Sequence, residues 1–174
     1  MRVAINGFGR IGRSVFRILD AADDIQVIAI NDLFDNEVLA YLLKYDTVMK
    51  GFGKDVKVEG DLLITKKERV KMLAIRDPKE LPWKELDIDV VVEATGIFRS
   101  RESLNQHLDA GAKRVILTVP AKDEIDSTVV IGVNCDELKP EHRIISNASC
   151  TTNCLAPMAK VLNDNFGIVE GLMT

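Results

Sequence analysis

Cysteine is scarce in this 174-residue sequence, which contains only three such residues. An odd and small number of cysteines does not build a disulfide framework. Cys150 and Cys154 lie four residues apart, a spacing that differs from the C-x2-C pair of common zinc sites. We therefore expect no metal site, and a reducing compartment as the environment of the protein.

Long apolar runs are also absent, and none approaches the ~20 residues that a membrane-spanning helix needs. Gly7 interrupts the N-terminus too early for the apolar region of a secretory signal. An excess of positive charge is lacking as well, because 27 acidic residues outnumber 23 basic ones and the net charge is -4. These absences predict a cytoplasmic protein that binds neither membranes nor nucleic acid.

Three glycines follow the first apolar run of the chain. Residues 2–6 predict a buried strand, and Gly7, Gly9 and Gly12 then form a G-x-G-x-x-G motif that leads into an amphipathic helix. In a dinucleotide-binding turn, the first glycine permits the tight bend and the second lets the backbone approach a pyrophosphate. The third allows the helix to pack closely on the strand. The motif therefore predicts a dinucleotide site here.

An acidic residue completes this pattern. Residues 25–31 predict a second strand, and Asp32 follows it, twenty residues after Gly12. A carboxylate in this position accepts hydrogen bonds from the adenosine ribose and repels a 2'-phosphate. Leu33 and Phe34 supply no arginine that could bind such a phosphate. The sequence therefore favours NAD over NADP as the cofactor.

The remaining apolar segments predict one α/β fold with a doubly wound, mostly parallel Rossmann sheet. Residues 87–94 carry a nearly continuous apolar run, which is typical of a parallel strand covered on both faces. No flexible linker or low-complexity segment interrupts the chain. Further predicted elements are helices over 35–45, 100–110 and 150–165, an antiparallel meander over 55–75 at the sheet edge, and strands over 113–118, 129–133, 143–146 and 168–173.

Cys150 lies among small polar residues at the predicted start of a helix. The thiolate is the nucleophilic form of cysteine, and a helix N-terminus favours it through unpaired N–H groups and a partial positive charge. Cys150 is therefore the first candidate for chemistry. The alternative is a small residue that packs a helix.

The chain resembles the phosphorylating glyceraldehyde-3-phosphate dehydrogenase family. The motifs that carry this resemblance are AINGFGRIGR at 4–13, AINDL at 29–33, KYDTV at 44–48, EATGIF at 93–98 and SNASCTTNCLAP at 146–157. The resemblance implies that Cys150 adds to the aldehyde of glyceraldehyde 3-phosphate and that a hydride then passes to NAD. Inorganic phosphate would release the thioester as 1,3-bisphosphoglycerate, with Ser149 and Thr151 binding a phosphate group.

The same resemblance implies an NAD-binding domain over 1–148. It is followed, over 149–174, by the active-site helix and first strand of a truncated α+β catalytic domain. A homotetramer is implied for the full-length family. Besides the three glycines, the implied cofactor residues are Arg10 and Ile11 in the glycine loop, Asp32 at the adenosine ribose, Arg76 near the adenine, Thr95 and Gly96 along the dinucleotide, and Thr118 toward the nicotinamide ribose.

The main departure from the family pattern is that no residue of this chain matches the family's general base. His107 and His142 match no catalytic motif, and the family's histidine base and substrate-phosphate arginine come later than residue 174. We therefore expect the chain to cover about the first half of such an enzyme. Two interpretations stay open: the N-terminal part of this enzyme, with erythrose-4-phosphate dehydrogenase as a close variant, or an NAD-binding module that catalyses nothing.

Overall fold

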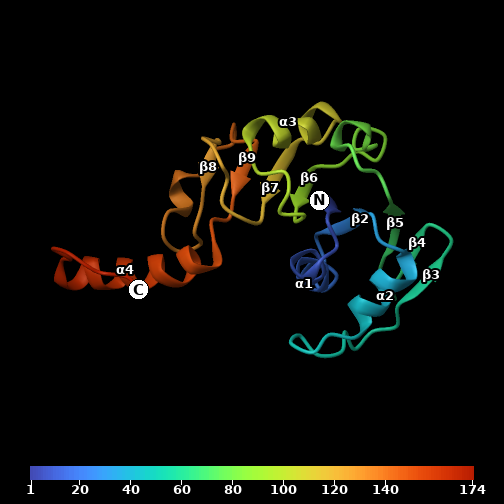
Figure 1. Ribbon diagram of the computed structural model, residues 1–174, viewed down its shortest axis with the longest axis horizontal. Coiled ribbons are helices and arrows are strands. Elements are labelled where there is room, and N and C mark those ends of the chain that lie inside the picture. Colours follow the sequence, from blue (N-terminus) through green and yellow to red (C-terminus); the bar gives the residue numbers. More distant parts are fainter.

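Short apolar runs form the centre of a nine-stranded sheet in the computed structural model, which describes residues 1–174 (Figure 1). From β5 onward the strands run parallel, in the order β5-β2-β1-β6-β7-β9-β8. Their bounds are Arg2–Asn6 for β1, Gln26–Asn31 for β2, Arg69–Leu73 for β5, Val90–Glu93 for β6, Arg114–Leu117 for β7, Ser127–Thr128 for β8 and Ile144–Ser146 for β9.

The strand order reverses beside β1. The first half of the chain builds the sheet outward through β2 and β5, and the second half builds it in the opposite direction through β6, β7 and β9. This is the doubly wound arrangement of a Rossmann fold, so the predicted fold class is confirmed. Such a reversal opens a crevice at the carboxyl ends of the two central strands, which are β1 and β6 here.

The sheet ends in an antiparallel meander, as the charged segment 55–75 predicted. Strands β3 (Lys57–Glu59) and β4 (Leu62–Ile64) pair with each other, and β4 pairs antiparallel with β5. The meander forms the edge beyond β5.

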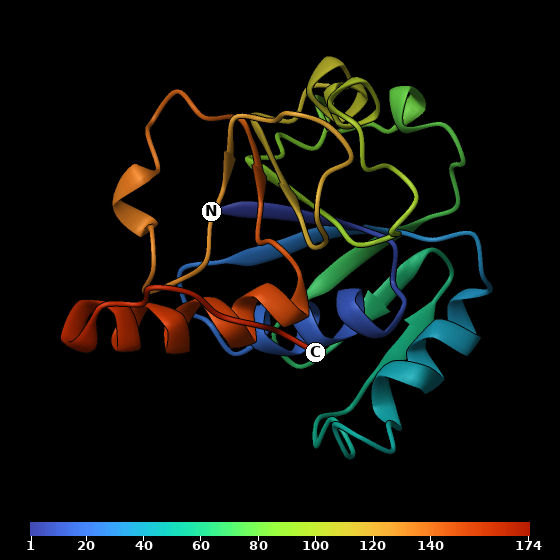
Figure 2. The same cartoon turned by 60° about the vertical axis from the view of Figure 1, so that its left-hand side comes forward.

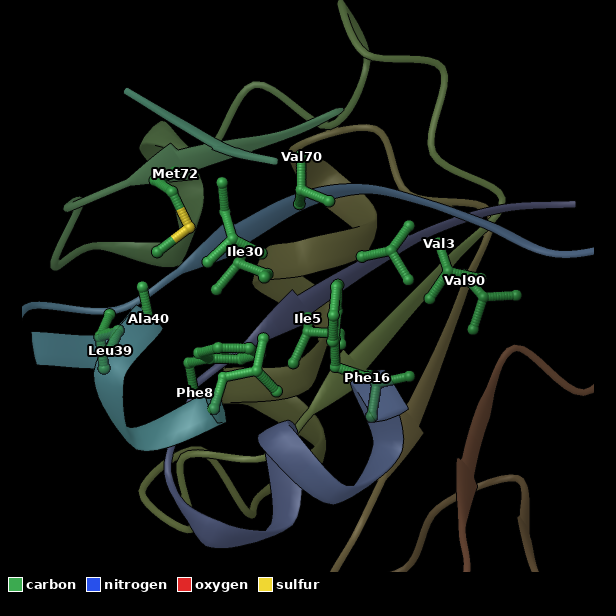
Figure 3. Close-up of a cluster of buried hydrophobic side chains, with 14 residues drawn as sticks. Val3, Ile5, Phe8, Phe16, Ile30, Leu39, Ala40, Val70, Met72 and Val90 are labelled. Atoms are coloured by element: carbon green, nitrogen blue, oxygen red, sulfur yellow. The ribbon is translucent and has the colours of Figure 1, made fainter. Parts of the chain in front are cut away.

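Helices cover both faces of the sheet because alternate side chains of the central strands are apolar on either side. Val3 and Ile5 of β1 pack under α1 (Arg10–Leu19) and α2 (Asn36–Lys44), in a cluster that also contains Phe8 and Phe16 (Figure 3). Ala4 points to the opposite face, where Trp83 lies in a second cluster. Helix α3 (Arg101–Asp109) lies across the sheet from α1 (Figures 1 and 2).

The predicted helix boundaries follow local capping. The Asp35 carboxylate accepts the N–H groups of Glu37 and Val38 at the start of α2, and Ser100 forms a capping box with Ser103 at the start of α3. Short 3-10 turns occupy Pro78–Glu80 (η1) and Cys135–Glu137 (η2).

Two predicted strands do not form. Residues 129–133 turn back on themselves, with a Val133 N–H to Val130 carbonyl bond of 3.0 Å and Gly132 at φ +82, so the pairing with β9 ends at Thr128. Residues 168–173 have no strand beside them, and Val169 is 99% exposed. A strand is stabilised by hydrogen bonds to a neighbour, so apolar composition alone does not make one.

Helix α4 (Cys150–Phe166) extends from the end of β9 and buries none of its residues (Figure 1). It continues through Pro157, although proline inside a helix removes a backbone hydrogen bond. Several of its large apolar side chains are exposed: Leu155, Met158, Val161, Leu162 and Phe166. None of the helices in the structure combines the length and apolarity that crossing a membrane requires.

Candidate cofactor and active site

The turn between β1 and α1 needs glycine at two positions. Gly7 has φ +91, and a Cβ there would lie 2.7 Å from the backbone nitrogen of Thr95. A Cβ on Gly12 would lie 2.0 Å from the Gly7 carbonyl oxygen. Gly9 is different, because a Cβ there would meet nothing within 4 Å. The turn therefore packs tightly against the segment that follows β6 and against the start of α1, and it leaves open space at Gly9.

Asp32 ties the end of β2 to this turn. Its Oδ2 accepts the Phe8 N–H at 2.6 Å, and its Oδ1 accepts the Phe34 N–H at 3.1 Å. Each carboxylate oxygen can accept a further hydrogen bond. The side chain also lines the neighbouring cavity, so it is held in place and remains available to a ligand.

A cavity of about 650 Å³ opens at the carboxyl ends of β1, β2 and β6, where the strand order reverses. Five of the predicted cofactor residues line it: Gly7, Gly9, Asp32, Arg76 and Thr95. A hollow of about 730 Å³ is larger, but it lies at the C-terminal end of α1, opposite the glycine turn, and only one of its nine lining residues is hydrophobic. Mixed apolar and polar walls are typical of cofactor sites, so the first cavity is the better candidate.

Five other predicted residues do not line this cavity: Arg10, Ile11, Gly12, Gly96 and Thr118. Arg10 forms an ion pair with Asp46 at 3.1 Å. The N–H of Met49, followed by that of Val48 and the charge of Arg10, holds the pKa of Asp46 below its ordinary value against the opposing effect of burial. The Thr118 hydroxyl donates to the Glu93 carbonyl at 3.1 Å, which places Thr118 one strand beyond the cavity.

Buried polar residues below the cavity were missed by the sequence reasoning. Asn6, Asn31 and Glu93 stand at the ends of three adjacent strands, and His107 of α3 bonds to Glu93. The sequence did carry one signal for Glu93, which directly follows three apolar valines in VVVE at 90–93. A carboxylate buried in such a strand needs polar partners. Only the convergence of the strand ends reveals those partners.

Cys150 is the first residue of α4, as the sequence predicted, and it is exposed. Ser149 caps this helix, since its Oγ accepts the Thr152 N–H at 2.9 Å. The Thr151 Oγ1 lies 2.9 Å from the same oxygen. A thiol and two hydroxyls therefore surround a helix N-terminus, where N–H groups and the helix dipole favour anions.

The bend before Cys150 is strained. Ala148 has φ +57, a conformation that residues with a side chain rarely adopt. Three side-chain hydrogen bonds stabilise it: Asn153 Nδ2 donates to the carbonyls of Asn147 and Ser149 at 2.7 and 2.9 Å, and the Ser146 Oγ accepts the Ala148 N–H at 3.0 Å. The bend thus keeps the thiol at a defined place.

The bend also belongs to the cavity's edge of the sheet. The Asn147 N–H donates to the Leu117 carbonyl at 3.0 Å, at the ends of the neighbouring strands β9 and β7. Strand β7 lies directly beside β6, whose end forms part of the cavity. Because all these strands are parallel, Cys150 and the cavity lie at the same edge of the sheet.

Comparison with known proteins assigns the family. Residues 1–101 match the family model described as glyceraldehyde 3-phosphate dehydrogenase, NAD binding domain. The chain belongs to the glyceraldehyde-3-phosphate dehydrogenase family. Residues 149–174 also match the model of the C-terminal domain of that family. The N-terminal part of the chain is thus a domain whose cofactor is NAD.

Individual relatives agree with this assignment. The chain is 59% identical to glyceraldehyde-3-phosphate dehydrogenase of Thermotoga maritima, with 99% of the chain and 52% of that protein covered. It is 57% identical to glyceraldehyde-3-phosphate dehydrogenase 2 of Bacillus subtilis, with 100% and 51% covered. It is 54% identical to the enzyme of Geobacillus stearothermophilus, with 100% and 52% covered. The chain spans about half the length of the curated relatives that it matches.

The residues present fit NAD. The space above Gly9 leaves room for a pyrophosphate against the backbone and the first turn of α1. Asp32 lines the same cavity and is followed by Leu33 and Phe34, which offer no positive charge to a 2'-phosphate.

Proposed function

We propose that this chain supplies the cofactor site and the nucleophile of a phosphorylating glyceraldehyde-3-phosphate dehydrogenase. One observation carries the proposal: an exposed cysteine opens α4 at the same edge of the sheet as the NAD cavity. We assign residues 1–148 to a dinucleotide-binding domain and residues 149–174 to the beginning of a catalytic domain. A separate family model that starts at residue 149 supports this boundary.

In the cofactor site, the pyrophosphate of NAD lies against Gly9 and the N–H groups of Arg10 and Ile11. These groups open α1 and have no partner within the helix. Asp32 accepts the hydroxyls of the adenosine ribose. Arg76 and Thr95 line the rest of the cavity wall.

Gly96 and Thr118 extend the cofactor site toward β7. Gly96 has φ +73, and a Cβ there would meet nothing within 4 Å, so this turn offers open backbone to the dinucleotide. Thr118 follows β7 and lies between the cavity and the bend that precedes Cys150. We place the nicotinamide end of the cofactor on this side, where the bound cofactor accepts a hydride from the substrate.

In the reaction, the Cys150 thiolate attacks the aldehyde carbon of glyceraldehyde 3-phosphate and forms a hemithioacetal. The Cys150 N–H belongs to the first turn of α4, where N–H groups have no partner within the helix, and it stabilises the oxyanion. After hydride transfer, inorganic phosphate attacks the thioester and releases 1,3-bisphosphoglycerate. Ser149 and Thr151 hold a phosphate group through their hydroxyls, which flank the thiol.

We further propose that the 174 residues alone do not complete this cycle, because they offer Cys150 no histidine base. His107 is fully buried, and both of its ring nitrogens are hydrogen-bonded. His142 precedes β9, whereas Cys150 follows its other end, and its Nδ1 accepts the Lys139 N–H at 3.3 Å. An NAD-binding module without catalysis is therefore the second candidate for the chain as it stands.

An erythrose 4-phosphate substrate is a variant that uses the same cysteine chemistry. We also propose a cytoplasmic location and homotetrameric assembly for the protein to which this chain belongs. A relative of Trypanosoma brucei brucei that carries the name cytosolic is 52% identical and supports the location.

The test titrates the chain with NAD by calorimetry and then follows NADH after addition of glyceraldehyde 3-phosphate and phosphate. We expect saturable NAD binding and no sustained NADH formation. NADH formation that the Cys150→Ser variant loses would overturn the proposed inactivity of the chain alone. Absence of any NAD binding would overturn the proposed cofactor site.

A further inference from the structure

At the carboxyl end of β6, the Glu93 carboxylate is fully buried and accepts four hydrogen bonds. Asn6 Nδ2 lies 2.6 Å and His107 Nε2 lies 3.0 Å from its Oε2. The Thr95 N–H lies 2.8 Å from Oε1, and the Thr95 hydroxyl donates to the same oxygen. No lysine or arginine forms an ion pair with Glu93, so these donors replace its solvation.

The directions of the hydrogen bonds on the Asn6 side follow from one backbone group. The Ile75 N–H can only donate, so the oxygen of the Asn31 amide must face it, at 2.8 Å. The Asn31 Nδ2 then faces the Asn6 Oδ1 at 2.7 Å. Asn6 is thereby left with its Nδ2 toward Glu93. Each group in this series donates toward the carboxylate.

A second series reaches Glu93 from the opposite side. The indole N–H of Trp83 can only donate, and it lies 3.1 Å from His107 Nδ1. This nitrogen therefore carries a lone pair, and the ring proton of His107 is on Nε2, where it points at Glu93. Asn6, a neutral His107 and Thr95 thus all present donors, and Glu93 accepts them as an ionised carboxylate.

These residues form the floor of the NAD cavity. Asn6, Asn31, Ile75 and Thr95 all line it, although Glu93 itself does not. The Thr95 oxygen also accepts the Ile97 N–H at 3.1 Å, which fixes the turn that contains Gly96. The orientation of this floor depends on one buried negative charge.

We propose that Glu93 is a positioning residue for the cofactor. Its ionised carboxylate orients Asn6 and the Thr95–Gly96 turn before NAD binds, so that no reorganisation is needed on binding. This inference rests on the proposed cofactor site and adds a residue that does not touch the ligand.

Glu93→Gln tests the charge without changing the shape. An amide keeps one oxygen, but its NH2 group must face either Thr95 or the pair formed by Asn6 and His107, and both sides present donors. A buried donor is then left without an acceptor. We expect the Kd for NAD to rise about tenfold. The indole N–H resonance of Trp83, the only tryptophan of the chain, should shift in the same variant.

Two variants serve as controls. Leu104→Ala removes a buried side chain of α3 that packs against Val115 and does not line the cavity, so it lowers the stability and should leave the Kd unchanged. Glu102→Gln removes an exposed carboxylate of the same helix and should leave both the Kd and the indole resonance unchanged. An unchanged Kd in Glu93→Gln, or an equal rise in Leu104→Ala, would overturn the positioning role.

Failure of the proposed cofactor site has a separate signature. If the unaltered chain does not bind NAD, both proposals fall, whereas equal binding by the chain and Glu93→Gln removes only the role of Glu93. Should Glu93→Gln not fold, His107→Phe and His107→Gln decide, because His107 donates to Glu93 and does not line the cavity. The phenylalanine variant lacks one donor to Glu93 and should raise the Kd about threefold, while the glutamine variant keeps an N–H donor and should leave the Kd unchanged. Equal affinities of these two variants would contradict the proposal.

Discussion

A pair of glycine substitutions separates the folding of the glycine turn from its binding of NAD. In Gly7→Ala the new Cβ would lie 2.7 Å from the Thr95 nitrogen, at a φ of +91. The left-handed conformation costs roughly 1 to 2 kcal/mol, and overpacking costs roughly 1 to 3 kcal/mol. We therefore expect a loss of about 2 to 5 kcal/mol, which lowers the Tm of a chain of this size by roughly 4 to 20 °C.

Gly9→Val should have the opposite profile. Its backbone has φ -69, and a Cβ meets nothing within 4 Å, so the side chain enters open space without strain. That space is where we place the pyrophosphate. Loss of one charge-assisted hydrogen bond costs about 2 kcal/mol, or roughly thirtyfold in Kd. The Tm without ligand should stay within about 2 °C of the unaltered chain.

Differential scanning calorimetry and NAD titration of the three proteins measure both effects. The expected pattern is a destabilised Gly7→Ala and a stable Gly9→Val that binds NAD weakly. Titration curves of Gly9→Val that superimpose on those of the unaltered chain would refute the placement of the pyrophosphate. A Gly7→Ala variant that melts like the unaltered chain would refute the argument from backbone conformation and contact with Thr95.

Three further predictions concern other parts of the chain. Asn153→Ala removes two hydrogen bonds that stabilise the strained bend before Cys150. The thiol is then held less firmly at the helix N-terminus, so its alkylation by iodoacetamide, measured by mass spectrometry, should be slower. An unchanged rate would contradict this prediction. Burial raises the pKa of Glu68 above its ordinary value, so folding favours the protonated form. The resulting stability is lost as the pH rises through the folded-state pKa. Glu68→Gln should flatten that part of the plot of Tm against pH. Phe166, 82% exposed, should promote self-association that Phe166→Ser reduces in sedimentation velocity runs.

Features that depend on neighbouring residues could be predicted from the sequence. The strand over residues 2–6, the helices predicted over 35–45 and 100–110 and the start of α4 at Cys150 all match the structure within a residue or two. In each case a side chain meets a backbone group only a few positions away, or a run of apolar residues meets the two covered faces of a parallel sheet. Residues 129–133 and 168–173 were predicted wrongly because a strand also needs a partner, which composition does not specify.

By itself the sequence determined the Rossmann framework, the glycine turn with Asp32 and the candidate nucleophile, since each is a short pattern with a local physical meaning. The tertiary structure decided how these parts meet. Asn6 and Glu93 are 87 positions apart, and they come within 2.6 Å only because β1 and β6 are neighbours in the sheet. Hydrogen-bond directions such as theirs depend on which groups converge in space, and this follows from the packing of the whole sheet.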